Sequence, residues 1–235
     1  MKILSVLLQV TSPVDNPLDL SSPLFQTEAQ MNVVDLAFKG GWIMGVLLIL
    51  SLIAVYVFIQ RLMFIRQAAK QDESFMSRIK DYIYDGKIES ALNLCRSTNS
   101  PTARMIAKGI SRLGRPTSDV LVSIENAGNI EVAKLEKGLP VIATIAGGAP
   151  MVGFLGTVTG MIRSFYAMAN AGTNVDITVL SGGIYEALVT TVGGLVVGII
   201  AMFGYNYLVS LVSNVVNKLE TSTMDFMDLL NEPSK

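Results

Sequence analysis

The sequence predicts an all-α membrane protein, with three transmembrane helices extended by cytoplasmic helices. Hydrophobic residues make up 51% of its 235 residues and charged residues only 16%, whereas a soluble domain usually carries roughly a quarter charged residues. Three stretches are long enough to cross a bilayer, which takes about 20 apolar residues in a helix. The region between the first and second stretches contains no strand-like run, so helices are expected there too.

The composition also excludes most enzyme chemistry. The chain has no histidine and one cysteine, which rules out a Ser-His-Asp or Cys-His nucleophilic site, a histidine or multi-cysteine metal site, and an internal disulfide. The net charge of −1 gives no reason to expect nucleic acid as a partner. We therefore expect a protein that is not an enzyme and holds no metal or cofactor.

The N-terminal forty residues divide into two predicted parts. Residues 1–30 read as an external tail containing Pro13, Pro17 and Pro23. Its first eight residues resemble the start of a signal peptide, although no clear small-residue cleavage site follows. Residues 31–39 show helical spacing of apolar residues, which fits either an interfacial helix or an extension of the first span.

The three spans are bounded by charged residues. The first uncharged stretch ends at Arg61, the second lies between Lys137 and Arg163, and the third is interrupted only by Glu186 before it ends at Lys218. These limits predict transmembrane helices over 40–61, 138–163 and 179–208. An external loop is expected over 164–178, and a cytoplasmic C-terminal helix over 209–235.

Orientation follows from the basic residues near the span ends, which favour the cytoplasmic side. Only Lys39 closely precedes the first span, and Arg163 is the only basic residue between the second and third. The flanks expected in the cytoplasm are richer in such residues: Arg61, Arg66, Lys70, Arg78 and Lys80 after the first span, Lys134 and Lys137 before the second, and Lys218 after the third. The N-terminus is therefore predicted to lie outside, and residues 62–137 and the C-terminus in the cytoplasm.

The cytoplasmic region, 62–137, is predicted to be helical with three breaks. These fall at residues 85–86, 99–101 and 114–116, where Gly, Pro, Asn and Asp gather. A further helix from about Thr117 is expected to run on into the second span, and Cys95 to be a small buried residue. The C-terminal tail shows an apolar face with a period near 3.6, which should pack on these helices: Val209, Val212, Val216, Leu219, Met224, Met227 and Leu230.

Glu186 is the most informative residue, because it is the only Asp, Glu, Lys or Arg between Asp176 and Lys218. A carboxylate at that depth costs a few kcal/mol or more on insertion scales, and protonation relieves the cost. Glu186 could be a neutral acid that makes an interhelical hydrogen bond, or an acid that lines a polar pathway. A pathway would need copies from other subunits, or a partner with its own ionisable group.

Threonines accompany this acid. Thr190 lies four residues after Glu186 on the same helical face, Thr191 is its neighbour, and Thr157 lies in the second span. Any one of them could simply bond a carbonyl of its own helix, as Thr144 and Thr159 could. Their convergence with a buried acid favours Thr157 and one of the pair Thr190 and Thr191 as pathway residues.

Glycine is concentrated in the same two spans. Gly156 and Gly160, and Gly194 and Gly198, have the GxxxG spacing that permits close helix approach, and Gly153 lies on the same segment. A nucleotide-binding loop is excluded because no Lys-Ser/Thr follows and the glycines lie inside an apolar span. Pro150 should kink the second helix and free a carbonyl.

Two segments resemble the ExbB/TolQ subunits of bacterial proton-driven motors, and more distantly MotA. They are LPVIATIAGGAPMVGFLGTVTGMIRSFY at residues 139–166 and GGIYEALVTTVGGLVVGIIAMFGYN at residues 182–206. The resemblance extends from Met31 to about Leu230. It implies that Glu186 is the membrane glutamate of the family, and that Thr157 and Thr191 are its pathway threonines. The helical wheel favours Thr190 instead, and we follow the family.

The resemblance also implies an assembly and a function. Such subunits form a homopentamer with a central pore, which surrounds a single-span ExbD/TolR-like partner whose aspartate takes up the proton. Protons are the transported ion, and the work is delivered from the inner membrane to a TonB-like or TolA-like protein. The long external N-terminus favours an ExbB role in energised outer-membrane import. A TolQ role in envelope integrity and division, and a passive membrane scaffold, are the alternatives.

Overall fold

The computed structural model describes residues 40–70, 74–170 and 177–231, and throughout these ranges the secondary structure is helical, with no strand. The helices, in chain order, are α3 (Gly41–Ala69), α4 (Phe75–Tyr84), α5 (Ile88–Ser97), α6 (Pro101–Ile110), α7 (Thr117–Glu136), α8 (Leu139–Asn170) and α9 (Ile177–Asn231). The predicted external tail, 1–30, and the interfacial helix, 31–39, lie outside the described residues.

Three segments are long and apolar enough to cross a membrane. They are Gly41–Ala69, Thr117–Asn170 and Leu180–Asn231, with mean hydropathies of 2.7, 1.7 and 2.2 over their most apolar stretches. In the second segment we assign the span to α8, because α7 carries several charged residues. Among the described residues, the prediction of an all-helical chain with three helices long and apolar enough to span a membrane is confirmed.

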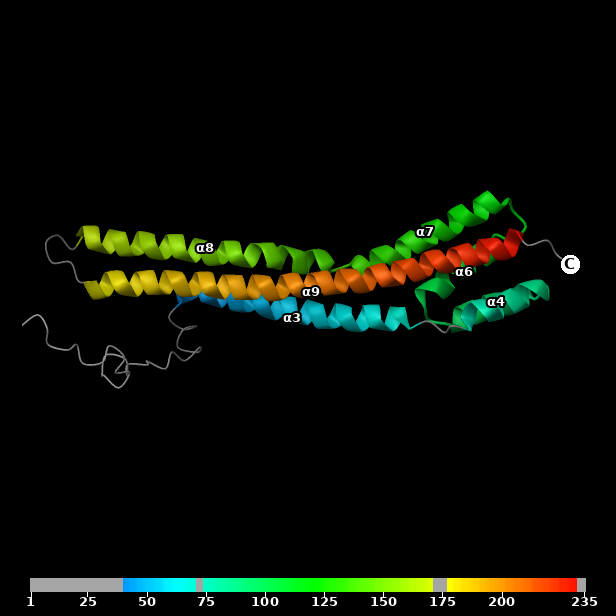
Figure 1. The fold of residues 1–235 in the computed structure, drawn as a ribbon, viewed down its shortest axis with the longest axis horizontal. Helices are drawn as coiled ribbons and strands as arrows, with labels where there is room; N and C mark the ends of the chain where they lie inside the picture. The colour runs from blue at the N-terminus through cyan, green and yellow to red at the C-terminus, as the bar shows by residue number, and fades with distance from the viewer. Residues whose placement is uncertain (1–39, 71–73, 171–176, 232–235) are drawn as a thin grey trace, which may run out of the picture. The chain divides into compact units, whose positions relative to one another are not determined.

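The long helices lie side by side (Figure 1). α8 packs along α9, and α3 packs on both, most extensively on α9. At about 1.5 Å per residue, the 55 residues of α9 extend to about 80 Å, well beyond a hydrocarbon core of about 30 Å. α9 therefore leaves the membrane as a continuous helix and carries its C-terminal half to α4, α6 and α7.

Two sequence predictions about helix limits were wrong. A helix does not run uninterrupted from Thr117 into the second span, because Gly138 has a left-handed φ of 89° between α7 and α8. Pro140 follows in the first turn of α8, where its missing N–H is no loss. The segment predicted as a loop over 164–178 is helical as far as Asn170 and again from Ile177. Residues 164–170 contain neither glycine nor proline, so nothing in them stops the helix.

The predicted breaks between the cytoplasmic helices are confirmed. Gly86 has a φ of 70° after α4, and Gly114 a φ of 87° before α7. Ser100 caps α6 by accepting a hydrogen bond of 3.1 Å from the Ala103 backbone N–H, and Pro101 opens the helix. Cys95 is a free thiol, 2% exposed, as predicted.

The C-terminal half of α9 buries a heptad-like stripe whose members are alternately four and three residues apart. They are Leu208, Val212, Val215, Leu219, Ser222, Phe226 and Leu229. The predicted amphipathic packing is present, with Val212 and Leu219 on the stripe. Met224 was wrongly placed in the buried face: it is 66% exposed, because it lies between Ser222 and Phe226 on the opposite side of the helix.

Candidate functional site

The candidate site lies where α8 and α9 approach closely, and glycines make that approach possible. A Cβ on Gly194 would lie 2.6 Å from the carbonyl oxygen of Ala149 and 2.8 Å from the Cα of Gly153. A Cβ on Gly153 would lie 2.8 Å from the Thr190 carbonyl oxygen, and one on Gly160 3.0 Å from the Ala187 Cβ. These neighbours are mostly backbone atoms, so only glycine fits at the present helix separation.

Pro150 is part of the same interface. α8 continues through this proline as one helix, and its ring faces Gly198, where an added Cβ would lie 2.7 Å from the Pro150 Cδ. Proline at position 150 cannot donate to the Ala146 carbonyl one turn earlier. That carbonyl oxygen would lie 3.0 Å from a Cβ on Gly198, so it faces the glycine of α9.

Thr157 of α8 and Thr191 of α9 meet across this interface, and their hydroxyl oxygens are in hydrogen-bond contact. The Thr157 hydroxyl lies 3.4 Å from the Gly153 carbonyl oxygen and 3.3 Å from that of Ala187. The Thr191 hydroxyl lies 3.3 Å and 3.4 Å from the same two oxygens. Each hydroxyl therefore has one acceptor on its own helix and one on the facing helix.

Thr190 occupies a different place. It is 1% exposed and donates to the Ala187 carbonyl oxygen at 2.8 Å. A Cβ on Gly156 would overlap its hydroxyl, and one on Gly40 would lie 3.4 Å from its methyl group. The structure thus pairs Thr157 with Thr191 and packs Thr190 between α8 and the start of α3.

The other two membrane threonines bond to their own helix. Thr144 donates to the Pro140 carbonyl at 2.8 Å, and Thr159 to the Leu155 carbonyl at 2.9 Å. This local bond is the usual way in which a threonine satisfies its hydroxyl in a membrane helix. Among the described threonines of α8, Thr157 is therefore distinguished by its contacts with α9.

Glu186 directly precedes Ala187, whose carbonyl is one of the two that both hydroxyls contact. One carboxylate oxygen is 3.8 Å from the Arg163 guanidinium, and the side chain is 33% exposed. The carboxylate also lies against Gly41, the first residue of α3, because a Cβ there would overlap it. A helix N-terminus carries unpaired N–H groups and a partial positive charge. Glu186 thus faces positive charge from two directions.

Sequence reasoning did not identify Arg163 as a neighbour of the acid. The available signal was that Arg163 is the only basic residue between the second and third spans. The two residues come together because α8 and α9 pack along each other on either side of a short connection. No feature of the sequence indicated that Gly41 lies beside Glu186, since this contact depends on which part of α9 the first residue of α3 packs against.

The arrangement combines a group that can hold a proton with groups that can pass one on. A carboxylate binds and releases a proton, and a hydroxyl both donates and accepts a hydrogen bond. Along α9, Thr191 of the hydroxyl pair follows Glu186 by five residues, about one and a half helical turns. No cluster of three metal-ligating side chains occurs among the described residues.

A second polar cluster lies on α6 and α7. Glu131 of α7, whose side chain is 6% exposed, accepts hydrogen bonds of 2.6 Å from Arg104 and 2.7 Å from Lys134. Burial alone would raise the pKa of this carboxyl, but the bonds and charges of the two cations together hold the pKa of Glu131 below its usual value. Glu131 is therefore ionised and fixes α6 against α7.

Comparison with known proteins shows which family the chain resembles. The sequence model of the MotA/TolQ/ExbB proton channel family matches residues 97–221. The chain is 30% identical to the ExbB-like 1 protein of Synechocystis sp. over 82% of its own length and 76% of the relative's. It is 27% identical to the Tol-Pal system protein TolQ of Haemophilus influenzae over 85% and 92% of the two chains. With the biopolymer transport protein ExbB of Xanthomonas campestris it shares 33% identity over 48% and 44%.

Proposed function

Because this chain belongs to the MotA/TolQ/ExbB proton channel family, we propose that it is the proton-channel subunit of an inner-membrane motor. Glu186, Thr157 and Thr191 line the proton path in this proposal, and Thr190 supports it from the packed side. The observation that carries it is the hydroxyl pair between α8 and α9, which contacts the carbonyl of Ala187, the residue directly after the membrane carboxylate Glu186.

The path needs a second protein. The described polar groups of this site cover only a small part of a hydrocarbon core of about 30 Å, so one chain cannot carry a proton across it. We propose a homopentamer whose α8 and α9 helices face a central pore that holds a single-span ExbD/TolR-like partner. An aspartate of that partner receives the proton, and passage of protons turns one component inside the other.

The orientation follows from charge. Arg61, Arg66 and Lys70 follow the membrane part of α3, whereas Arg163 is the only basic residue in the connection between the second and third spans. We therefore place the α8–α9 connection and the N-terminus in the periplasm, and α4–α7 with the C-terminus in the cytoplasm. Glu186 then lies in the periplasmic half of the membrane.

Relatives carry both ExbB and TolQ names, so two roles compete. We favour the ExbB-type role, in which the motor drives a TonB-like protein for energised outer-membrane import, because the external N-terminal tail is long. A TolQ-type role would instead deliver the work to a TolA-like protein. Co-purification with each candidate protein distinguishes the two, since only the true partner should remain bound and support activity.

The proton role is tested by replacing the carboxyl group. The full chain with its single-span partner is reconstituted into vesicles, and proton uptake is followed with an internal pH dye. Glu186→Gln and Glu186→Ala should reduce proton flux on the order of a hundredfold, the scale of losing one positioned acid–base group. Glu220→Gln is the matched control, because Glu220 is an exposed carboxylate on the same helix beyond the membrane.

Assembly is checked by the size of the purified complex. A variant that assembles normally but loses proton flux supports the channel role. Full flux and full energised import in assembled Glu186→Ala would overturn it and leave the passive scaffold, in which Glu186 only makes a packing hydrogen bond.

A further inference from the structure

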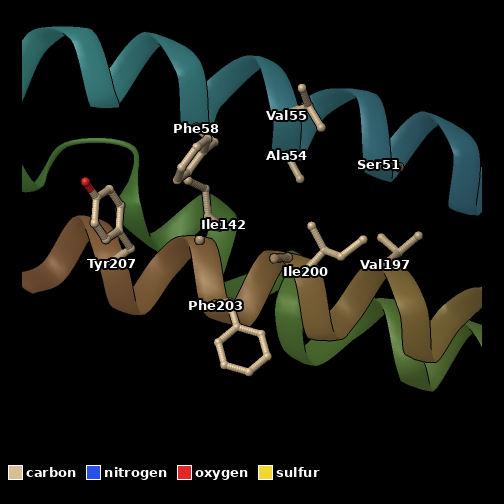
Figure 2. A pocket seen from close by; sticks show the side chains of 11 residues that line it. Ser51, Ala54, Val55, Phe58, Ile142, Val197, Ile200, Phe203 and Tyr207 are labelled. Atoms are coloured by element: carbon tan, nitrogen blue, oxygen red, sulfur yellow. The ribbon is translucent and has the colours of Figure 1, made fainter.

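An apolar groove of about 320 Å³ lies between α3 and α9, with α8 contributing one residue. Figure 2 shows Ala54, Val55 and Phe58 of α3 above Val197 and Ile200 of α9, with Tyr207 at one end. Apart from Ser51 and the phenol group of Tyr207, the side chains that line it are hydrocarbon. The proton-path residues do not line this groove, so it is a separate feature of the membrane region.

The length and position of the groove match one leaflet of a bilayer. Its lining covers 197–207 on α9, about 15 Å of helix, which is half of a hydrocarbon core of about 30 Å. Ser51 lies near the middle of the first predicted span, whereas Phe58 and Tyr207 lie near the ends of their spans that face the cytoplasm. Given the proposed orientation, the groove runs from the bilayer centre to the cytoplasmic surface.

The surface end of the groove carries a positive charge. The Arg66 guanidinium donates a hydrogen bond of 3.2 Å to the Tyr207 hydroxyl, and both groups are exposed there. Arg66 follows Phe58 by two turns on α3. An apolar slot that ends in a guanidinium and a phenol is complementary to a molecule with a hydrocarbon tail and an anionic head.

We propose that this groove binds an anionic phospholipid of the cytoplasmic leaflet. One acyl chain lies between α3 and α9 along Ser51, Ala54 and Val197, and the phosphate is held by Arg66 and Tyr207. Such a lipid would fill the open groove between α3 and α9. The proposed lipid binding depends on the membrane orientation but not on proton transfer through Glu186. It can therefore be tested independently of the channel role.

The test uses photoreactive lipids on the full-length chain. The protein is reconstituted in phosphatidylcholine nanodiscs that contain a trace of phosphatidylglycerol with a diazirine near the end of one acyl chain. After illumination, labelled peptides are mapped by mass spectrometry. We expect the label on residues 51–58 and 197–207. Phosphatidylcholine with the same diazirine chain should label these peptides about fivefold less, the scale of one basic residue acting on an anionic lipid.

Two sets of variants test separately the binding of the lipid's acyl chain and of its head group. Ser51→Phe and Val197→Phe should block the groove, whereas Leu52→Phe and Val196→Phe place the same phenyl group at adjacent exposed residues that do not line it. Arg66→Gln and Tyr207→Phe should each abolish the preference for phosphatidylglycerol. Arg115→Gln, which removes an exposed charge before α7, should leave it intact.

The wild-type comparison of the two lipids requires no substitution, so it decides the matter even if a variant fails to fold. Equal labelling by both lipids would overturn the proposal, as would labelling that the blocking variants leave unchanged. A separate protein cross-linking experiment that joins two copies of the chain at this groove would also overturn it, because it would show a second copy as the occupant.

Discussion

The hydroxyls of Thr157 and Thr191 form a reciprocal pair across the α8–α9 interface. Each lies four residues after one of two carbonyls, those of Gly153 and Ala187, and each is within 3.4 Å of both. A hydroxyl in this position can release its own helix carbonyl and turn to the facing helix without losing a hydrogen bond. The pair can therefore rearrange when a proton or a water molecule approaches.

Removal of one hydroxyl should impair proton flux more than it impairs folding. Thr157→Val or Thr191→Val keeps the side-chain shape but interrupts the pair, and we expect flux to fall on the order of tenfold, because a bridging water can replace one hydroxyl only in part. Proton uptake by vesicles that contain the complex measures the effect. The double variant should lose little more than either single variant, since the two act as a unit.

Thr159→Val is the matched control for this pair. Thr159 bonds only to carbonyls of α8, those of Leu155 and Gly156. Its loss should leave proton flux within the experimental scatter of the wild type. Equal loss from Thr159→Val and Thr157→Val would show that the contact between α8 and α9 has no special part in the flux.

Gly194→Ala should destabilise the packing of α8 on α9. Its Cβ would lie 2.6 Å from the Ala149 carbonyl oxygen, which cannot move without moving α8. We expect a loss of about 1–3 kcal/mol, the usual cost of overpacking, measured as a lower unfolding temperature in detergent. Gly147→Ala on α8 is the control, because no described atom beyond its chain neighbours and its own helix backbone would lie within 4 Å of the added Cβ. Equal stability of the two variants would contradict the close approach of the helices.

Gly138→Ala should weaken the junction between α7 and α8. Gly138 has a φ of 89°, a conformation that costs other residues about 1–2 kcal/mol. Its added Cβ would also lie 2.7 Å from the Nε of Arg61. Gly114→Ala separates the two effects, since Gly114 has a φ of 87° and no neighbour within 4 Å. Thermal unfolding should show the larger loss for Gly138→Ala, and the reverse order would exclude the Arg61 contact as a constraint.

Acid should destabilise the packing of α6 on α7 through Glu131. Arg104 and Lys134 hold the folded pKa of this carboxyl below its usual value. Its contribution to stability is therefore complete above the unfolded pKa of about 4.3, and is lost as the pH falls through the lower folded value. The urea midpoint of the wild type should fall more steeply below about pH 4 than that of Glu131→Gln.

Glu136→Gln, an exposed position on the same helix, should keep the wild-type pH dependence. If the urea midpoints of the wild type and Glu131→Gln fall equally with decreasing pH, the ion pairs of Glu131 do not contribute to the pH dependence of stability.

Cys95 should react slowly with maleimides at neutral pH. Burial raises the pKa of its thiol to about 11, so the reactive thiolate is scarce at pH 7. Asn93→Cys in a Cys95→Ala background provides an exposed thiol on the same helix. The rate of labelling, measured by mass spectrometry, should be about two orders of magnitude faster for the exposed thiol. Comparable rates would mean that α5 opens readily in solution.

Features that depend on local pattern were predicted well. The uncharged stretches predicted the membrane helices, because hydrocarbon excludes charged side chains in any fold. Gly86, Ser100-Pro101 and Gly114 predicted the breaks between helices, because the conformation of a turn depends on its local sequence. The predicted end of the second transmembrane helix was wrong, because residues 164–170 continue the helix beyond the charged residue Arg163. Prediction also failed at Gly138, where a single left-handed glycine separates two segments that both favour helix.

The site was predicted only in part, for a related reason. Residue type and depth singled out Glu186 and the threonines, because an acid in hydrocarbon stands out in any fold. An ideal helical wheel placed Thr190 beside the acid, but α8 packs so closely that Thr191 is the residue whose hydroxyl meets Thr157. Of the two neighbours of Glu186 on other helices, Gly41 left no pattern in the sequence, and Arg163 left only its position as the one basic residue between the second and third spans.

The sequence alone determined that this chain spans a membrane three times and carries a single acid within its third span, because the bilayer acts on each segment separately. Only the tertiary structure decided which hydroxyls meet, which cation faces the acid and where a groove opens between α3 and α9. Those outcomes depend on how far two helices can approach and how each is rotated about its axis, and the glycines and side chains of both helices set these distances together.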